Sequence, residues 1–133
     1  MKIDAKIIQC ACDALKEAKI VSNEGTDEGT FPEEFKGYTS AFGVAVVQMG
    51  LYPALLIYED KNANTSAERY KLADALRFLL IKLYGYKYNC EKLSQLYADN
   101  ESQRKEMQAH VDTALVALKL ALRIYEPNKK NNA

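Results

Sequence analysis

Apolar residues recur at the three- and four-residue spacing of an α helix through most of the chain, and the stretches between these segments are polar. In the first segment, for example, Ile3, Ile7, Ala11 and Ala14 fall on one helical face. Helical segments are predicted over residues 2–21, 30–50, 53–60, 65–85, 91–97 and 101–125. No stretch shows the alternation between hairpin turns that is typical of a strand.

Residues at the segment ends strengthen this interpretation. Thr30 or Phe31 is expected to cap the second helix, with Pro32 at its first position, and Thr65 or Ser66 to cap the fourth. Gly50 and Gly85 are natural C-terminal stops. Inside the second helix, Gly43 costs helix propensity and indicates close packing against a neighbouring helix.

The pattern therefore predicts an all-α protein, an irregular bundle of five to six helices with no sheet. Its length favours one domain over residues 1–133, with an exposed acidic loop at 22–31 and a frayed tail at 127–133. The last helix is apolar nearly all round in its second half, which is typical of a central helix or one that meets a partner protein. The expected core includes Phe42, Leu76, Leu79, Val111, Leu118 and Leu122.

Composition narrows the possible functions. Lys+Arg and Asp+Glu both number 18, so the formal net charge is +0 and argues against strong binding of RNA or DNA by this chain alone. A few phosphate contacts within a larger assembly remain compatible with this balance. We expect a cytoplasmic protein without a membrane role, because no apolar h-region follows Met1 and no apolar run is long enough to span a bilayer.

The cysteines are candidate metal ligands. Cys10, Cys12, Cys90 and His110 could in principle supply four ligands to one zinc ion. Two helical residues two positions apart point about 200° apart, however, so one ion cannot easily take both Cys10 and Cys12. We therefore expect reduced, buried cysteines, no metal and no cofactor.

One enzyme-like spacing stands out. Arg104 precedes His110 by six residues near the start of a predicted helix, as in small helical RNases of the HEPN class. A basic residue and a histidine this close also occur often by chance, and His110 borders an apolar stripe. No phosphate loop, nucleophile elbow or cofactor fingerprint is present, and we expect no catalytic residues.

Basic residues of the last helix offer a different chemistry. Lys105, Lys119 and Arg123 share one helical face with Asp112, as either a solvated surface or a short track for RNA phosphates. Nine tyrosines could similarly stack on bases, although most lie on apolar stripes that favour core packing.

The segment from Lys36 to Leu51, KGYTSAFGVAVVQMGL, resembles subunit five of the Cmr, or type III-B, CRISPR effector complex. In that family a tyrosine-bearing helix runs into an Asn-Gly-Leu turn, and a short helix with an aliphatic–aromatic centre and a lysine follow. Here the turn begins with Met49 in place of asparagine, and PALLIYEDK follows it. TALVALKLALR, at 113–123, resembles the closing helix of the family.

This resemblance implies a non-catalytic helical subunit in antiviral defence. Its implied partners are the large polymerase-like subunit, the backbone subunits, further copies of itself, and the guide and target RNA. We expect Lys119 and Arg123 to contact RNA, with Lys36 and Lys82 as helpers on neighbouring helices. The alternatives are a HEPN-like RNase that uses Arg104 and His110, and an unrelated helical interaction module.

Overall fold

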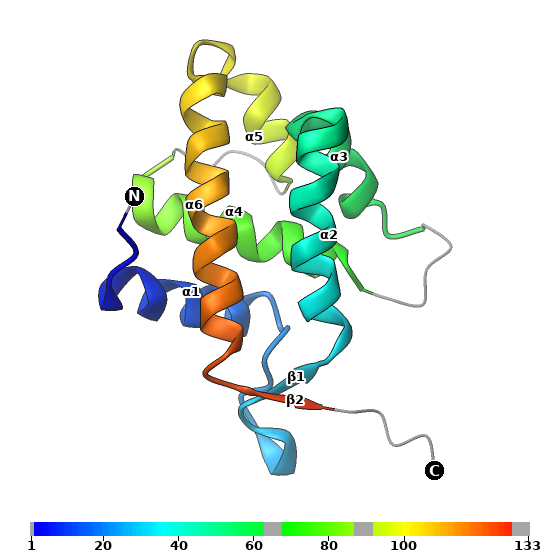
Figure 1. The fold of residues 1–133 in the computed structure, drawn as a ribbon, viewed down its shortest axis with the longest axis vertical. Coiled ribbons are helices and arrows are strands. Elements are labelled where there is room, and N and C mark those ends of the chain that lie inside the picture. The colour runs from blue at the N-terminus through cyan, green and yellow to red at the C-terminus, as the bar shows by residue number, and fades with distance from the viewer. Residues whose placement is uncertain (1, 63–67, 87–91, 129–133) are drawn as a thin grey trace.

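The computed structural model describes residues 2–62, 68–86 and 92–128. Within these ranges the chain forms six α helices, two 3₁₀ turns and two short strands (Figure 1). The helices are α1 (Ala5–Glu17), α2 (Glu34–Met49), α3 (Leu51–Glu59), α4 (Tyr70–Tyr84), α5 (Leu93–Asp99) and α6 (Arg104–Leu122). The 3₁₀ turns are η1 (Gly25–Asp27) and η2 (Glu101–Gln103), and the strands are β1 (Thr30–Pro32) and β2 (Glu126–Asn128).

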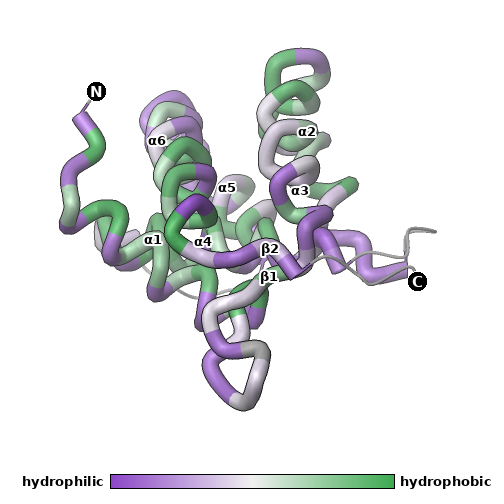
Figure 2. Tube along the Cα trace, turned by 60° about the horizontal axis from the view of Figure 1, so that its bottom comes forward, coloured by the Kyte–Doolittle hydropathy of each residue, from purple (hydrophilic) through white to green (hydrophobic). Residues whose placement is uncertain are grey.

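Helix α6 is the centre of the bundle. It runs along the length of the molecule and packs against α1, α2 and α4 (Figure 1). Figure 2 shows α1, α4 and α6 grouped together with their hydrophobic stretches, while the hydrophilic connection between α1 and β1 projects away. The residues predicted for the core are all buried: Phe42, Leu76, Leu79, Val111, Leu118 and Leu122.

Local sequence explains where several helices begin and end. The Asp4 carboxylate accepts a hydrogen bond from the Ile7 backbone N–H at 2.9 Å and caps α1. Gly85 follows α4 with φ 65°, in the left-handed region that glycine adopts without steric cost. Gly50, with φ 93°, separates α2 from α3. The proposed capping residues Thr65 and Ser66 lie outside the described residues.

The first helix is shorter than predicted. It ends at Glu17, and Lys19 adopts a left-handed conformation with φ 63°. The Ile20 backbone N–H then donates to the Leu15 carbonyl at 2.9 Å, which closes the turn. Ile20 and Val21 are buried all the same, so their helical spacing in the sequence reflects burial after a turn rather than another helical turn.

The prediction of no sheet was wrong in one place. Strands β1 and β2 form a parallel pair in which Phe31 lies opposite Pro127. The residues 30–32 therefore do not start α2, which begins at Glu34, and residues 127 and 128 do not belong to a frayed tail. Phe31 is buried, which also corrects the exposed loop predicted over 22–31. Three-residue strands are too short to show alternation, and their prolines also match a helix start at Pro32 and a helix end at Pro127.

We predict that the stability of the bundle depends on the inner face of α6. Leu118 is 0% exposed, so Leu118→Ala leaves a cavity and should lower the free energy of unfolding by about 2–5 kcal/mol. Urea denaturation followed by circular dichroism measures the loss. Leu120→Ala is the matched control, because Leu120 is 36% exposed on the same helix. It should cost less than half as much, and equal losses would contradict this arrangement of α6.

Candidate nucleic-acid interface

Helices α2 and α6 run in opposite directions side by side (Figure 1). Gly43 permits this approach: a Cβ atom at that position would lie 3.4 Å from Leu115 Cδ2, so the close packing predicted from the sequence is present. Where the start of α2 meets the end of α6, a groove of about 290 Å³ opens, which we call the α2–α6 groove. It is lined by Lys36, Thr39, Ser40, Lys119, Leu122 and Arg123.

The α2–α6 groove is positively charged. Three of the four cations predicted from the sequence, Lys36, Lys119 and Arg123, line it together. Among the described residues, none of the three forms an ion pair, and no carboxylate lines the groove. The exposed Ser40 side chain adds a hydroxyl group to the lining. An anionic group such as phosphate would find compensating charge and a hydrogen-bond donor there.

Lys82, the fourth predicted cation, lies apart from the groove on α4. Its ammonium group donates a hydrogen bond to the Asp13 carboxylate of α1 at 2.9 Å. The hydrogen bond from Lys82 lowers the pKa of Asp13, and the same bond raises the pKa of Lys82. Lys82 therefore already has an acidic partner, unlike the three cations of the groove.

The structure separates Arg104 from His110. They are six residues apart on α6, so their Cβ atoms are separated by about 120° around the helix axis. Arg104 donates to the backbone carbonyls of Tyr97 at 3.3 Å and Ala98 at 3.1 Å, at the end of α5. Arg104 is thus bound to the end of α5, and its contacts do not include His110.

His110 takes part in an aromatic cluster instead. Its ring stacks on Tyr84 with centroids 3.6 Å apart, and its Nδ1 atom lies 2.6 Å from the Tyr86 hydroxyl. Glu106 approaches its Nε2 atom at 4.0 Å. This set of contacts accounts for a histidine beside an apolar stripe, and it holds residue 86 against α6.

The cysteines and acidic residues form no metal centre in the part of the chain that the structure describes. No group of three or more His, Cys, Asp and Glu side chains lies close enough there to hold an ion. Cys10 and Cys12 are buried in α1, and Cys90 falls outside the described residues. Among those residues, too, no helix has the length and apolar character needed to cross a membrane.

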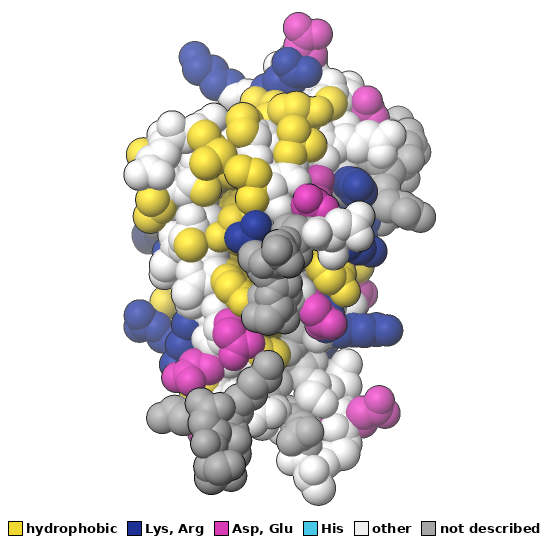
Figure 3. Space-filling view, turned by 90° about the vertical axis from the view of Figure 1, so that its right-hand side faces the viewer, with side chains coloured by type: hydrophobic (Ala, Val, Ile, Leu, Met, Phe, Trp, Pro, Cys, Tyr) yellow, Lys and Arg dark blue, Asp and Glu magenta, His cyan; other side chains and the backbone are white. Residues whose placement is uncertain are grey.

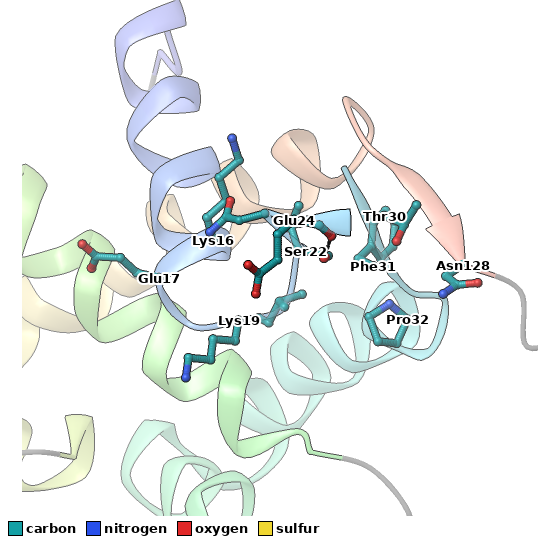
Figure 4. A pocket seen from close by; sticks show the side chains of 12 residues that line it. Lys16, Glu17, Lys19, Ser22, Glu24, Thr30, Phe31, Pro32 and Asn128 are labelled. Atoms are coloured by element: carbon teal, nitrogen blue, oxygen red, sulfur yellow. Dashed lines mark hydrogen bonds between the residues drawn. The ribbon is translucent and has the colours of Figure 1, made fainter. Parts of the chain in front are cut away.

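A larger hollow, of about 490 Å³, lies beside the strand pair (Figure 4). Lys16 and Glu17 of α1 line one side of it, and Pro32 and Asn128 line the other. Lys19 and Glu24 add one charge of each sign. Because its charges are mixed, this hollow favours neither an anion nor a cation, and the α2–α6 groove is the better candidate for binding RNA.

A broad apolar surface was only partly visible in the sequence. Figure 3 shows hydrophobic side chains gathered over the upper part of the side formed by α2 and α3. We call this surface the apolar face; its exposed residues are Val44, Val47, Met49, Leu56 and Ile57. Tyr52 is also exposed, but its ring stacks on Tyr97 of α5. On α6, Val116 and Leu120 are also exposed, as the all-round apolar pattern of that helix predicted. An uncovered surface of this kind is typical of a protein that meets a partner.

These features are those of a small helical subunit of an assembly: a helical bundle, one cationic groove and one apolar face. The family model described as "CRISPR-associated protein (Cas_Cmr5)" matches residues 8–125. The chain belongs to this family, and the predicted resemblance to subunit five of the type III-B complex is confirmed. It is therefore a small subunit of a Cmr complex in CRISPR defence. No curated protein and no solved structure matches the chain.

The pairing of Lys82 with Asp13 leads to a pH-dependent prediction. The pKa of Asp13 is lowered from 3.8, so its carboxylate contributes stability above that pH, and the contribution is lost as the pH falls through the lowered pKa. Asp13→Asn should therefore lower the urea midpoint slightly at pH 7. The difference should shrink in acid and in 1 M NaCl.

Asp112→Asn is the control for this measurement. Burial raises the pKa of Asp112, so its carboxylate contributes no stability at pH 7, and the substitution should leave the midpoint unchanged or raise it. A loss at Asp13 that persists unchanged in acid would show that the ion pair is not its cause.

Proposed function

We propose that this chain is a non-catalytic subunit that stacks in the filament of the type III-B complex and helps to hold the guide–target RNA duplex. The observation that carries this proposal is the gathering of Lys36, Lys119 and Arg123 in the α2–α6 groove without acidic partners among the described residues. Phosphate contacts of this kind position a nucleic acid without reading its sequence.

The overall charge supports a role inside an assembly rather than alone. With a formal net charge of +0, the chain lacks the long-range attraction that concentrates RNA at the surface of a basic protein. Three cations are enough when other subunits already hold the strand, because each contact then adds to an existing complex. Lys82 is a candidate for a separate contact, made only if RNA displaces Asp13.

The apolar face supports protein partners. We propose that it meets another subunit of the complex: the large polymerase-like subunit, a backbone subunit or a further copy of this chain. The Val47 side chain is 86% exposed. Contact with a partner would remove this apolar surface and that of its neighbours from water. The proposed setting is one domain in the cytoplasm.

We predict that the α2–α6 groove sets the salt dependence of RNA binding. Each phosphate contact on a single strand contributes about −0.7 to the slope of log affinity against log salt. Lys119→Ala combined with Arg123→Ala should therefore flatten the slope of the assembled complex by roughly one unit or more, equally for RNAs of different sequence. Lys36→Ala should have a smaller effect in the same direction.

Lys2→Ala combined with Lys6→Ala is the matched control, because it removes the same charge from exposed positions beside and within α1. This variant should keep the wild-type slope. Lys82→Ala tests separately whether Lys82 leaves its ion pair with Asp13 to bind RNA, because the slope should then flatten. An unchanged slope for the groove variant, in complexes of normal composition, would rule out phosphate contacts by these residues.

A further prediction concerns catalysis. Since Arg104 binds the carbonyls at the end of α5 and His110 contacts Tyr86, the purified chain should not cleave end-labelled RNA above the rate of a buffer blank. The RNA products are resolved on a denaturing gel over several hours. Cleavage that disappears in His110→Ala, but not in the control that combines Lys2→Ala with Lys6→Ala, would contradict the non-catalytic role and favour the RNase alternative.

A further inference from the structure

Three side chains from different helices meet at the end of the bundle opposite the strand pair. Tyr52 lies in the first turn of α3, Tyr97 in α5 and Arg104 at the start of α6. The two tyrosine rings stack with centroids 5.9 Å apart and an interplanar angle of 24°. The Arg104 guanidinium lies over the Tyr97 ring, 5.3 Å from its centroid. A hollow of about 400 Å³ is lined by these three side chains and Ala98.

Within this cluster, Arg104 and Tyr97 have a structural role. Arg104 donates to the carbonyls of Tyr97 and Ala98 at the C-terminal end of α5, where helix carbonyls lack partners within the helix. These hydrogen bonds hold the guanidinium over the Tyr97 ring. They leave its positive charge in place, and among the described residues no carboxylate forms an ion pair with it.

Tyr52 has no such structural role. Tyr52 is 40% exposed, and within the described residues its hydroxyl makes no hydrogen bond. Its ring contact is the stack on Tyr97. An exposed aromatic ring, a second ring beneath it and a fixed guanidinium are the groups on which proteins stack unpaired bases.

The position of the cluster relates it to the α2–α6 groove. Arg104 and Lys119 are 15 residues apart on α6, so they are separated by about 22 Å along the axis and about 60° around it. They therefore lie on the same side of the helix. At about 3.4 Å for each stacked nucleotide, a strand bound in the groove would reach the cluster after roughly six nucleotides.

We propose that Tyr52, Tyr97 and Arg104 form a stacking site for one unpaired base, at a point where the RNA strand whose phosphates lie in the α2–α6 groove leaves the duplex. This inference rests on the proposed function. A base is favoured over an apolar protein side chain because a nucleotide brings a phosphate that compensates the charge of Arg104. An apolar partner would bury that charge without compensation, at a high cost in free energy.

The test uses the assembled complex and RNAs that carry 2-aminopurine at one position, moved stepwise along the strand. Stacking quenches the fluorescence of this base, so the wild-type complex should show quenching at one defined position. Tyr52→Ala should remove that quenching and weaken binding at least about fivefold, because stacking contributes about 1–3 kcal/mol per base. Tyr52→Phe keeps the ring and should behave as the wild type.

The stacking site and the groove give different signatures. Tyr52→Ala removes no charge and should keep the salt slope, whereas Lys119→Ala with Arg123→Ala should flatten the slope. Gln108→Ala, one turn further along α6 from Arg104 and also exposed, is the control and should change neither the quenching nor the affinity. Tyr52→Leu, which keeps apolar bulk, should lose quenching as Tyr52→Ala does.

Two results would overturn the stacking site. The first is quenching and affinity that are unchanged in Tyr52→Ala. The second is a Tyr52→Ala chain that folds, as judged by circular dichroism, yet fails to enter the complex while the Gln108→Ala chain enters it. That result would make the cluster a contact with another protein subunit. Neither result would affect the salt slope, so the proposed phosphate contacts would be judged separately.

Discussion

The burial of α6 against α1, α2 and α4 is the contact on which the rest of the structure depends. Met107, Val111 and Leu118 lie along its inner face and are inaccessible or nearly so. Because these side chains fix the rotation of the helix about its axis, they also fix which residues face outward. Lys119 and Arg123 turn toward α2, and Arg104 toward α5, as a consequence of this packing.

The surface that results has three regions along the α2–α6 contact. Cations gather at the end of α6, apolar residues such as Val44 and Val116 are exposed along its middle, and aromatic rings with one guanidinium lie at its start. The cations suit phosphates, the apolar residues suit protein partners, and the aromatic rings suit bases. A neutral chain can thus present a local cationic surface, because its acidic groups are paired or placed elsewhere, as Asp13 is with Lys82.

The errors of sequence reasoning have a common cause. The strand pair joins residues 30–32 to residues 126–128, and no local pattern records a contact between segments so far apart. Ile20 and Val21 are apolar because they are buried, but periodicity alone cannot distinguish burial in a helix from burial after a turn such as that at Lys19. In each case the sequence indicates which residues are buried, but it does not determine the backbone conformation that buries them.

The sequence by itself determined the helical segments, the buried stripe of α6, the neutral charge and the family, because these follow from local periodicity, composition and short motifs. Tertiary structure decided which candidates act together. Lys36 joins Lys119 and Arg123 although more than eighty residues separate them in the chain, while Lys82 pairs with Asp13. Arg104 meets Tyr97 of α5, and His110 meets Tyr84 and Tyr86, because the packing of α6 brings a different neighbour to each. Side chains form a site only when packing brings their helices together, and that information lies in contacts between distant segments.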